Sequence, residues 1–144
     1  MSAPLQSGYK AINPYAFAVA WFGPLGAANA IGTKRWNVDL PKPYRWVSVP
    51  VNARGGSYVT APIVRVHTLA ATFTDAAREA DRTDNRAQVL VDYPGRDVTV
   101  GGATVRCLYA EILDAAHEEP YAAETVAVRF VSEYRFGFTL ISTT

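Results

Sequence analysis

The sequence contains few of the residues that mark a catalytic or metal site. Its one cysteine, Cys107, cannot form an internal disulfide, and no CxxC pair is present to hold a structural zinc. The only histidines, His67 and His117, have no partner at the spacing of an HxxxH or HExxH metal site. The motifs GxSxG, GxxxxGKS/T and GxGxxG do not occur. We therefore expect no enzyme, no metal and no cofactor, and we interpret Cys107 as a small buried side chain and His117-Glu118-Glu119 as a solvated loop.

Charged residues are also scarce. They make up 19% of the 144 residues, against about a quarter in typical soluble domains, while 49% are hydrophobic. A chain of this length and composition can bury a core without disulfides or metals. One copy alone would expose an unusually apolar surface, so we expect other subunits to cover part of it.

The charges are unevenly divided along the chain. Residues 1–60 hold six Lys and Arg against one acidic residue, whereas residues 61–144 hold eight basic and twelve acidic residues. Such a division favours head-to-tail contacts, in which the basic side of one copy meets the acidic side of the next. Ordinary drift of charge along a chain is the alternative interpretation.

No long uninterrupted hydrophobic run is present. The most apolar stretch, Tyr15–Ile31, is broken by Gly23-Pro24 and by Asn29, so we expect no membrane-spanning helix. The opening segment MSAPLQSGYK has no charged region followed by an apolar one. It does not resemble a secretion signal, and an intracellular protein is expected.

Capping and turn residues divide the chain into a flexible N-terminal arm, residues 1–12, and a single domain, residues 13–144. Asn13-Pro14 is typical of a helix start, and Gly23-Pro24 ends this short helix. The main helix is expected to begin at Thr72 or Thr74 and to end before Pro94. Strands are predicted over Arg45–Ala53, Pro62–Ala70, Asp97–Val100, Ala103–Leu113 and from Val126 onward.

Periodicity assigns buried faces to three of these elements. The first strand is expected to place Val47, Val49 and Val51 on one face, with Pro50 indicating an edge position or a strand boundary. The last strand has an aromatic even-numbered face, and its length predicts a bend, a bulge near Ser132 or a projection beyond its own sheet. The main helix is expected to bury a stripe, interrupted by Asp84, that consists of Phe73, Ala77, Ala80, Ala87 and Val91.

This order of elements predicts an α+β domain. We expect an antiparallel or mixed sheet of about four to five strands, packed on one main helix, with the short N-terminal helix beside it. The edges of such a sheet invite strand pairing between copies.

One basic segment, Lys34-Arg35-Trp36, places two cations beside an aromatic ring. This combination can hold a nucleic-acid backbone and stack a base, but no longer basic run accompanies it. A structural loop is therefore the preferred interpretation.

Three segments together resemble the tail terminator proteins of long-tailed, non-contractile phages. They are RWVSVPVNARGGS, APIVRVHTLAATFTDAAREADRTDNRAQVL and VRFVSEYRFGFTL. The similarity lies in element order, length and general texture, and it extends from about Asn13 to Ile141.

The resemblance implies a structural virion protein, assembled in the host cytoplasm, that forms a ring of usually six copies at the head-proximal end of the tail. Such a ring binds the major tail tube protein, stops its polymerisation and offers a docking face to the head completion or connector protein. Genome DNA would pass through its lumen without sequence-specific binding. A head completion or neck adaptor protein is the nearest alternative, and a small-ligand or enzyme domain is a more distant one.

Exposed loops are the candidate contact sites in this interpretation. Subunit contacts are expected on the strand edges and on the loop formed by Arg54, Gly55, Gly56, Ser57 and Tyr58. A contact with the tube or connector is expected at Lys34, Arg35 and Trp36.

Overall fold

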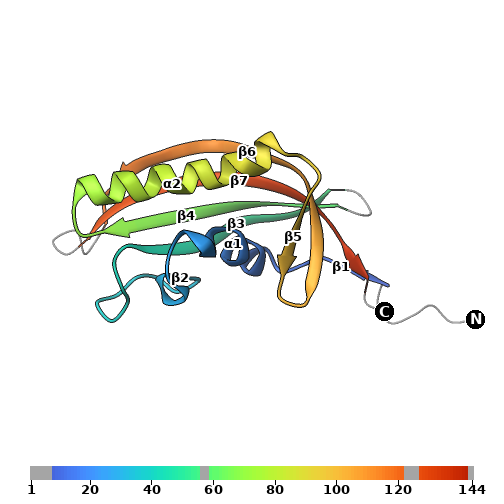
Figure 1. The fold of residues 1–144 in the computed structure, drawn as a ribbon, viewed down its shortest axis with the longest axis horizontal. Coiled ribbons are helices and arrows are strands. Elements are labelled where there is room, and N and C mark those ends of the chain that lie inside the picture. The colour runs from blue at the N-terminus through green and yellow to red at the C-terminus, as the bar shows by residue number, and fades with distance from the viewer. Residues whose placement is uncertain (1–7, 56–58, 122–126, 143–144) are drawn as a thin grey trace, which may run out of the picture.

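The computed structural model describes residues 8–55, 59–121 and 127–142, and within them two α-helices and eight strands follow one another (Figure 1). The helices are α1 (Pro14–Phe22) and α2 (Phe73–Asp92), and two 3-10 turns, Gly23–Leu25 and Ala28–Ala30, follow α1. The strands are β1 (Tyr9–Lys10), β2 (Ile31–Gly32), β3 (Tyr44–Gly55), β4 (Val59–Ala70), β5 (Arg96–Val100), β6 (Ala103–Glu119), β7 (Val128–Thr139) and β8 (Ile141–Ser142). The predicted α+β organisation is confirmed.

Both helices begin at the capping residues that the sequence predicts. The Asn13 side chain accepts hydrogen bonds from the backbone N–H groups of Tyr15 and Ala16. The Thr72 hydroxyl accepts from the N–H of Asp75 at 3.2 Å. These bonds satisfy donors that the first helical turn leaves unpaired. Neither helix is long and apolar enough to cross a membrane, in the part of the chain that the structure describes.

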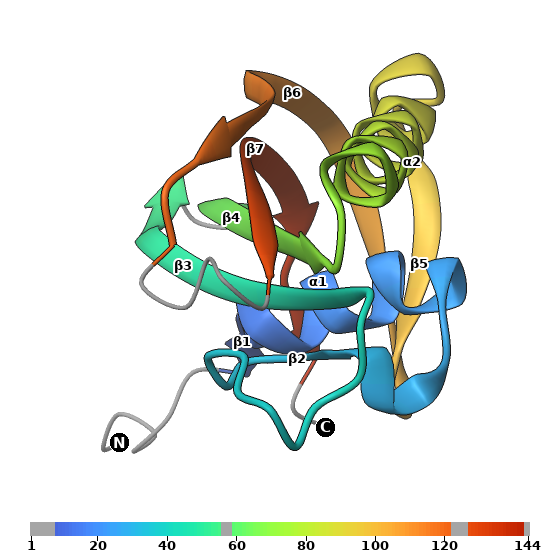
Figure 2. The same cartoon turned by 90° about the vertical axis from the view of Figure 1, so that its left-hand side faces the viewer.

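Six strands form one sheet in the order β2-β3-β4-β7-β6-β5. All neighbours are antiparallel except β2 and β3, so the sheet is mixed. The strand beyond the expected four to five is β2, which has two residues. Strands β1 and β8 pair separately with each other. Figure 2 shows how strongly the sheet curls from β3 round to β6.

Both helices pack on the same face of this sheet, which we call the helix face; the opposite side is the outer face. The even positions of β7 point to the helix face, as predicted. The Phe17 ring of α1 lies 5.4 Å from the Phe136 ring and 4.5 Å from the Phe138 ring, and Phe22 lies 5.6 Å from Tyr134, measured between centroids. All five rings are fully buried. Aromatic packing between α1 and β7 therefore forms the centre of the core.

The register shifts lie in β6 and not in the last strand, although both strands curve (Figure 2). Thirteen residues of β6, Cys107–Glu119, lie opposite ten residues of β7, Arg129–Phe138, because the register shifts at three places. Ser132 pairs with β4 in unbroken register, so the last strand has no bulge of its own there. The extra residue lies opposite it in β6, between Asp114 and His117. Extra residues in one strand bend it and increase its local twist.

The buried stripe of α2 differs from the predicted one. Phe73 is 57% exposed, whereas Glu79 and Thr83 are buried. The cause is Arg45 of β3, whose guanidinium donates to the Thr83 hydroxyl and to the Glu79 carbonyl, both at 2.9 Å. It also lies 3.5 Å from the Glu79 carboxylate. A buried, hydrogen-bonded ion pair thus holds α2 on β3, and such a pair is invisible to hydrophobic periodicity.

Asp84 interrupts the apolar stripe because it joins α2 to two strands. Its carboxylate accepts a hydrogen bond from the hydroxyl of Tyr134 in β7 and one from the backbone N–H of Ala116 in β6 at 2.9 Å. Burial and this bond raise the pKa of Tyr134, which stays protonated as a donor.

Two further expectations are corrected by the strand register. A shift between Ser48 and Val51 pairs Val51 with Ile63 on the outer face, so Val51 leaves the face that buries Val47. His117-Glu118-Glu119 continues β6 and is no loop. In both places the cause is pairing with a neighbouring strand, which local alternation does not reveal.

Candidate assembly interface

The distal part of β6 is the most exposed long strand segment in the described chain. Strand β5 pairs with Ala103–Cys107 only, so Leu108–Glu119 has β7 on one side and no strand on the other, as far as the described residues show. Three large apolar side chains are exposed within six residues of this segment: Leu108 (37%), Tyr109 (37%) and Leu113 (41%). Exposed apolar side chains grouped in this way mark protein interaction surfaces.

Acidic residues accompany these apolar side chains. The segment carries Glu111, Asp114, Glu118 and Glu119, which we call the acidic segment of β6. The Glu119 carboxylate lies 3.0 Å from the imidazole Nε2 of His117 and 3.9 Å from the Arg129 guanidinium. Glu111 and Glu118 form no ion pair with a described residue. The segment is therefore only partly neutralised.

The opposite edge of the sheet is built differently. Strand β2 pairs only with Arg45 and Trp46, so β3 continues as an edge from Val47 onward in the described structure. Pro50, which lacks an N–H group, and the register shift beside it interrupt this edge. Both devices block the addition of another strand. The edge position expected for Pro50 is confirmed, and the two edges of the sheet are unlike each other.

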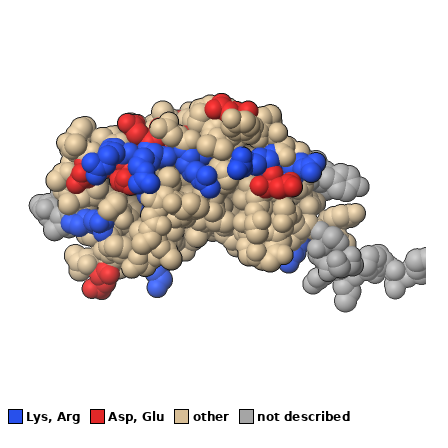
Figure 3. Space-filling model, viewed as in Figure 1, with Lys and Arg blue, Asp and Glu red and all other residues tan. Residues whose placement is uncertain are grey.

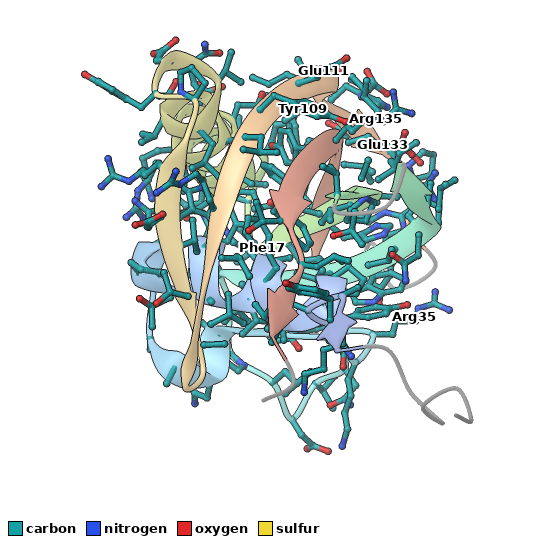
Figure 4. The ribbon with its side chains drawn as sticks, turned by 90° about the vertical axis from the view of Figure 1, so that its right-hand side faces the viewer. Phe17, Arg35, Tyr109, Glu111, Glu133 and Arg135 are labelled. Atoms are coloured by element: carbon teal, nitrogen blue, oxygen red, sulfur yellow. The ribbon has the colours of Figure 1, made fainter. Side chains whose placement is uncertain are left out.

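The outer face between these edges is a surface of packed polar side chains (Figure 4). In this view Tyr109, Glu111, Glu133 and Arg135 lie together across β6 and β7. The Tyr109 ring covers Gly137, where a Cβ atom would lie only 2.1 Å from the ring. The Arg65 guanidinium of β4 forms an ion pair with Glu133. This face is thus fixed in position and carries charges of both signs.

Lys34 and Arg35 are exposed, but Trp36 is not. The Trp36 ring is 5% exposed and its indole N–H donates to the carbonyl of Pro41 at 3.2 Å. Lys42 lies over the same ring, with Nζ 5.6 Å from its centroid. Trp36 therefore supports the loop from within and does not offer a ring for stacking, in agreement with the structural interpretation of this segment.

Arg35 belongs to a group that we call the Tyr121 cluster. Arg35 and Arg129 each place a guanidinium over the Tyr121 ring, with Cζ 5.1 and 5.2 Å from the centroid. The Tyr121 hydroxyl donates to the carbonyl of Trp36 at 2.9 Å and accepts from Arg35 Nε at 3.4 Å. Glu119 supplies the one carboxylate near Arg129 among the described residues.

The structure places only part of the second candidate loop. Arg54 and Gly55 end β3, where they pair with Thr60 and Val59. Gly56, Ser57 and Tyr58 lie outside the described residues. The described part of this candidate loop is thus the end of β3.

The two side chains best suited to nucleophilic or acid–base chemistry, Cys107 and His67, are both held in unreactive protonation states. Burial raises the pKa of the Cys107 thiol to about 11, so the sulfur is protonated at neutral pH. Its predicted role as a buried small side chain is confirmed. His67 is stacked on Trp46, with centroids 3.9 Å apart, and burial, reinforced by the charges of Arg129, Arg65 and Arg35, lowers the pKa of His67 to about 4. Among the described residues there is neither an enclosed pocket nor a group of three metal-ligating side chains.

Sequence reasoning missed the distal part of this exposed segment because the strand was expected to end at Leu113. The signal that could have extended it is the alternation beyond this residue, where Asp114, His117 and Glu119 share the outer face with a bulge between them. No protein-family model matches the chain, and no curated protein is significantly similar to it.

Proposed function

We propose that this chain is a structural subunit that assembles into a closed ring, and that the ring is the tail terminator of a long-tailed, non-contractile phage. The observation that carries the proposal is distal β6, a strand with an open edge on which three large apolar side chains are exposed. A second copy of the chain is the simplest cover for such a surface, because ring subunits bury equivalent patches in every copy.

The unlike edges of the sheet favour a ring over a simple pair. A two-fold dimer brings identical patches together, whereas a contact between two different patches leaves one of each unused and continues to the next copy. Distal β6 is apolar and acidic, while β3 is interrupted by Pro50. Because bulges also interrupt β6, the contact is expected to use side chains and not a continuous added ladder.

The work of such a ring is binding alone. One face would match the last layer of the tail tube and end its growth, and the other would receive the head completion or connector protein. Lys34 and Arg35 are exposed beside the Tyr121 cluster and remain the candidate contacts for one of these partners.

The proposal is tested with the purified chain and polymerised tail tubes. We expect native mass spectrometry to detect closed oligomers of about six copies, and electron micrographs to show them at one end of each tube. Leu113→Asn should weaken the oligomer without changing circular dichroism, because Leu113 is 41% exposed. Val38→Asn is the matched control, since Val38 is 77% exposed and lies outside β6.

The possible failures have different meanings. A chain that stays monomeric in the presence of tubes contradicts the ring. Rings that ignore tube ends contradict the terminator role but leave self-assembly standing. Equal behaviour of Leu113→Asn and Val38→Asn contradicts the placement of the interface on β6.

A further inference from the structure

Arg86 in α2 and Trp21 in α1 are joined by three contacts. The guanidinium lies over the indole, with Cζ 3.6 Å from the ring centroid. Arg86 Nε donates to the Trp21 carbonyl at 2.7 Å, and Trp21 Nε1 donates to the Arg86 carbonyl at 2.9 Å. Because the side chain uses only Nε, both Nη groups of Arg86 have no acceptor among the residues described. Arg86 is therefore fixed in position with most of its donors unused.

Arg96, the first residue of β5, brings a second guanidinium to the same ring. Its Cζ lies 5.9 Å from the Trp21 centroid, and the side chain is exposed. We call Trp21, Arg86 and Arg96 the Trp21 cluster. Burial first and the charge of Arg96 second lower the pKa of Arg86. Within the described ranges neither arginine forms an ion pair.

The neighbouring arginines are already paired. Figure 3 shows a band of basic side chains across the face that carries α2 and β5. In α2, Arg78 and Arg82 precede Arg86 at steps of four residues, which places the three on one side of the helix. Arg78 pairs with Asp75 at 2.9 Å and Arg82 with Glu79 at 2.6 Å. The unpaired positive charge of this band is thus concentrated in the Trp21 cluster.

Two guanidinium groups at one ring, without a counter-ion among the described residues, favour a carboxylate or phosphate, which such groups bind through paired N–H donors. The chain itself carries a suitable anion in the acidic segment of β6. Glu111 lies opposite Arg135 in the strand register, on the outer face, whereas the Trp21 cluster lies between the two helices on the helix face. The acidic side chains on the outer face therefore belong to a different surface from the arginines.

We propose that the Trp21 cluster is a carboxylate-binding site and that the acidic segment of β6 from a second copy occupies it. This inference rests on the proposed ring and defines its subunit contact. The contact joins two different patches, so each copy gives its acidic segment to one neighbour and receives another at its Trp21 cluster. Complementary charge guides the two patches together and rejects the reversed orientation.

Reversal of charge on each side of the contact tests the proposal. Arg96→Glu changes the exposed member of the cluster and leaves the Arg86–Trp21 bonds intact. Glu111→Arg changes the other side. Asp114→Arg, on the outer face as the register partner of Glu133, is its replacement if Arg135, the register partner of Glu111, destabilises the first variant. Asp39→Arg is the control, because Asp39 is an exposed acid in the 33–43 loop and belongs to neither patch.

Each reversed variant alone should assemble at least about tenfold more weakly in native mass spectrometry and size-exclusion chromatography, because like charges then face each other. A one-to-one mixture of Arg96→Glu and Glu111→Arg should recover assembly, since every contact in an alternating ring is again between opposite charges. Asp39→Arg should assemble like the unmodified chain.

Four other outcomes overturn the proposal. If the unmodified chain assembles and Arg96→Glu assembles equally well, the contact is elsewhere and the ring still stands. If the mixture does not recover assembly, the two patches are not partners. If Arg96→Glu assembles normally but loses binding to a short DNA duplex, the cluster binds phosphate. If the unmodified chain never assembles, the ring and this contact fail together.

Discussion

The Trp21 cluster and the Tyr121 cluster each contain two arginines at an aromatic ring, but the arginine charge is partly compensated only in the Tyr121 cluster. Each brings two arginines to within 6 Å of a ring that is 4% exposed. In the Tyr121 cluster the ring hydroxyl accepts a hydrogen bond from Arg35, and Glu119 compensates part of the charge of Arg129. In the Trp21 cluster no described carboxylate does so. A cation over an aromatic ring is therefore a structural contact in one place and an open binding position in the other.

The clusters also differ in what they join. The Trp21 cluster connects α1 with α2 on the helix face, through hydrogen bonds that run in both directions between Trp21 and Arg86. The Tyr121 cluster connects the 33–43 loop with the start of β7 and lies near Leu69 and Tyr44 of the sheet. The first supports the core and the second closes one end of the outer face.

The largest expected effect comes from removal of the indole. Trp21→Ala should lower the free energy of unfolding by about 3–5 kcal/mol, since it leaves a cavity in the core and removes the indole N–H bond to the Arg86 carbonyl. Urea unfolding followed by far-ultraviolet circular dichroism measures this loss. Val38→Ala is the surface control. A loss below 1 kcal/mol would mean that the Trp21 cluster does not support the core, and the contrast in packing would disappear.

The next largest expected effect is the pH dependence of stability that comes from His67, which lies beside the Tyr121 cluster. Burial first, and then the charges of Arg129, Arg65 and Arg35, lower the pKa of His67 to about 4 in the folded chain, against about 6.5 in the unfolded chain. Below pH 6.5 the unfolded state binds the additional proton. Stability should therefore be complete above pH 6.5 and fall by at most about 3 kcal/mol as the pH decreases toward 4.

His67→Gln should flatten this part of the stability profile, measured by urea unfolding at a series of pH values. His117→Gln is the matched control, because hydrogen bonding to Ala115 raises the pKa of His117, with the charges of Asp114 and Glu119 contributing. The stability from His117 is complete below its unfolded pKa and is lost as the pH rises through its folded pKa. An unchanged slope in His67→Gln would show that His67 does not govern the acid limb.

The smallest expected effect is on stability, which single substitutions of Arg96 and Arg129 should change in different directions. Arg96→Gln removes a repulsive neighbour of Arg86 and should leave stability unchanged or raise it, by about 0.5 kcal/mol at most. Arg129→Gln removes the contacts with Tyr121, Pro120 and Glu119 and should lower the thermal midpoint. Differential scanning calorimetry of the two variants compares them directly. Equal destabilisation by both substitutions would contradict the view that only one cluster lacks a counter-ion.

Local sequence signals predicted the elements and much of the core. The caps at Asn13 and Thr72 act between residues two or three positions apart, and the buried even face of β7 follows from strict alternation. These features depend on neighbours in the chain, so one sequence is sufficient to find them. The exposure of Lys34 and Arg35 likewise follows from a polar loop.

The remaining features depend on partners far away in the sequence. Arg45 was assigned to a strand, but its buried pair with Glu79 rotates the buried stripe of α2. Asp84 weakened the prediction of α2 although it fastens the helix to Tyr134 and Ala116. Trp21 was placed in a short helix with no indication that Arg86 and Arg96 would converge on it. Only the fold brings these charges together, so the candidate carboxylate site had no sequence signature.

The extra residues of β6 have a consequence for insertion and deletion. Successive side chains of a strand alternate between its two faces, so loss of one residue from a regularly paired stretch reverses the positions that follow. Leu113 is the extra residue between Ile112 and Asp114, which lie opposite the consecutive residues Tyr134 and Glu133. Its deletion would remove one of the three bulges and leave Asp114, His117 and Glu119 on the outer face. Loss of a residue at a bulge is therefore expected to preserve the distal strand, whereas loss of a residue between the bulges would redirect it.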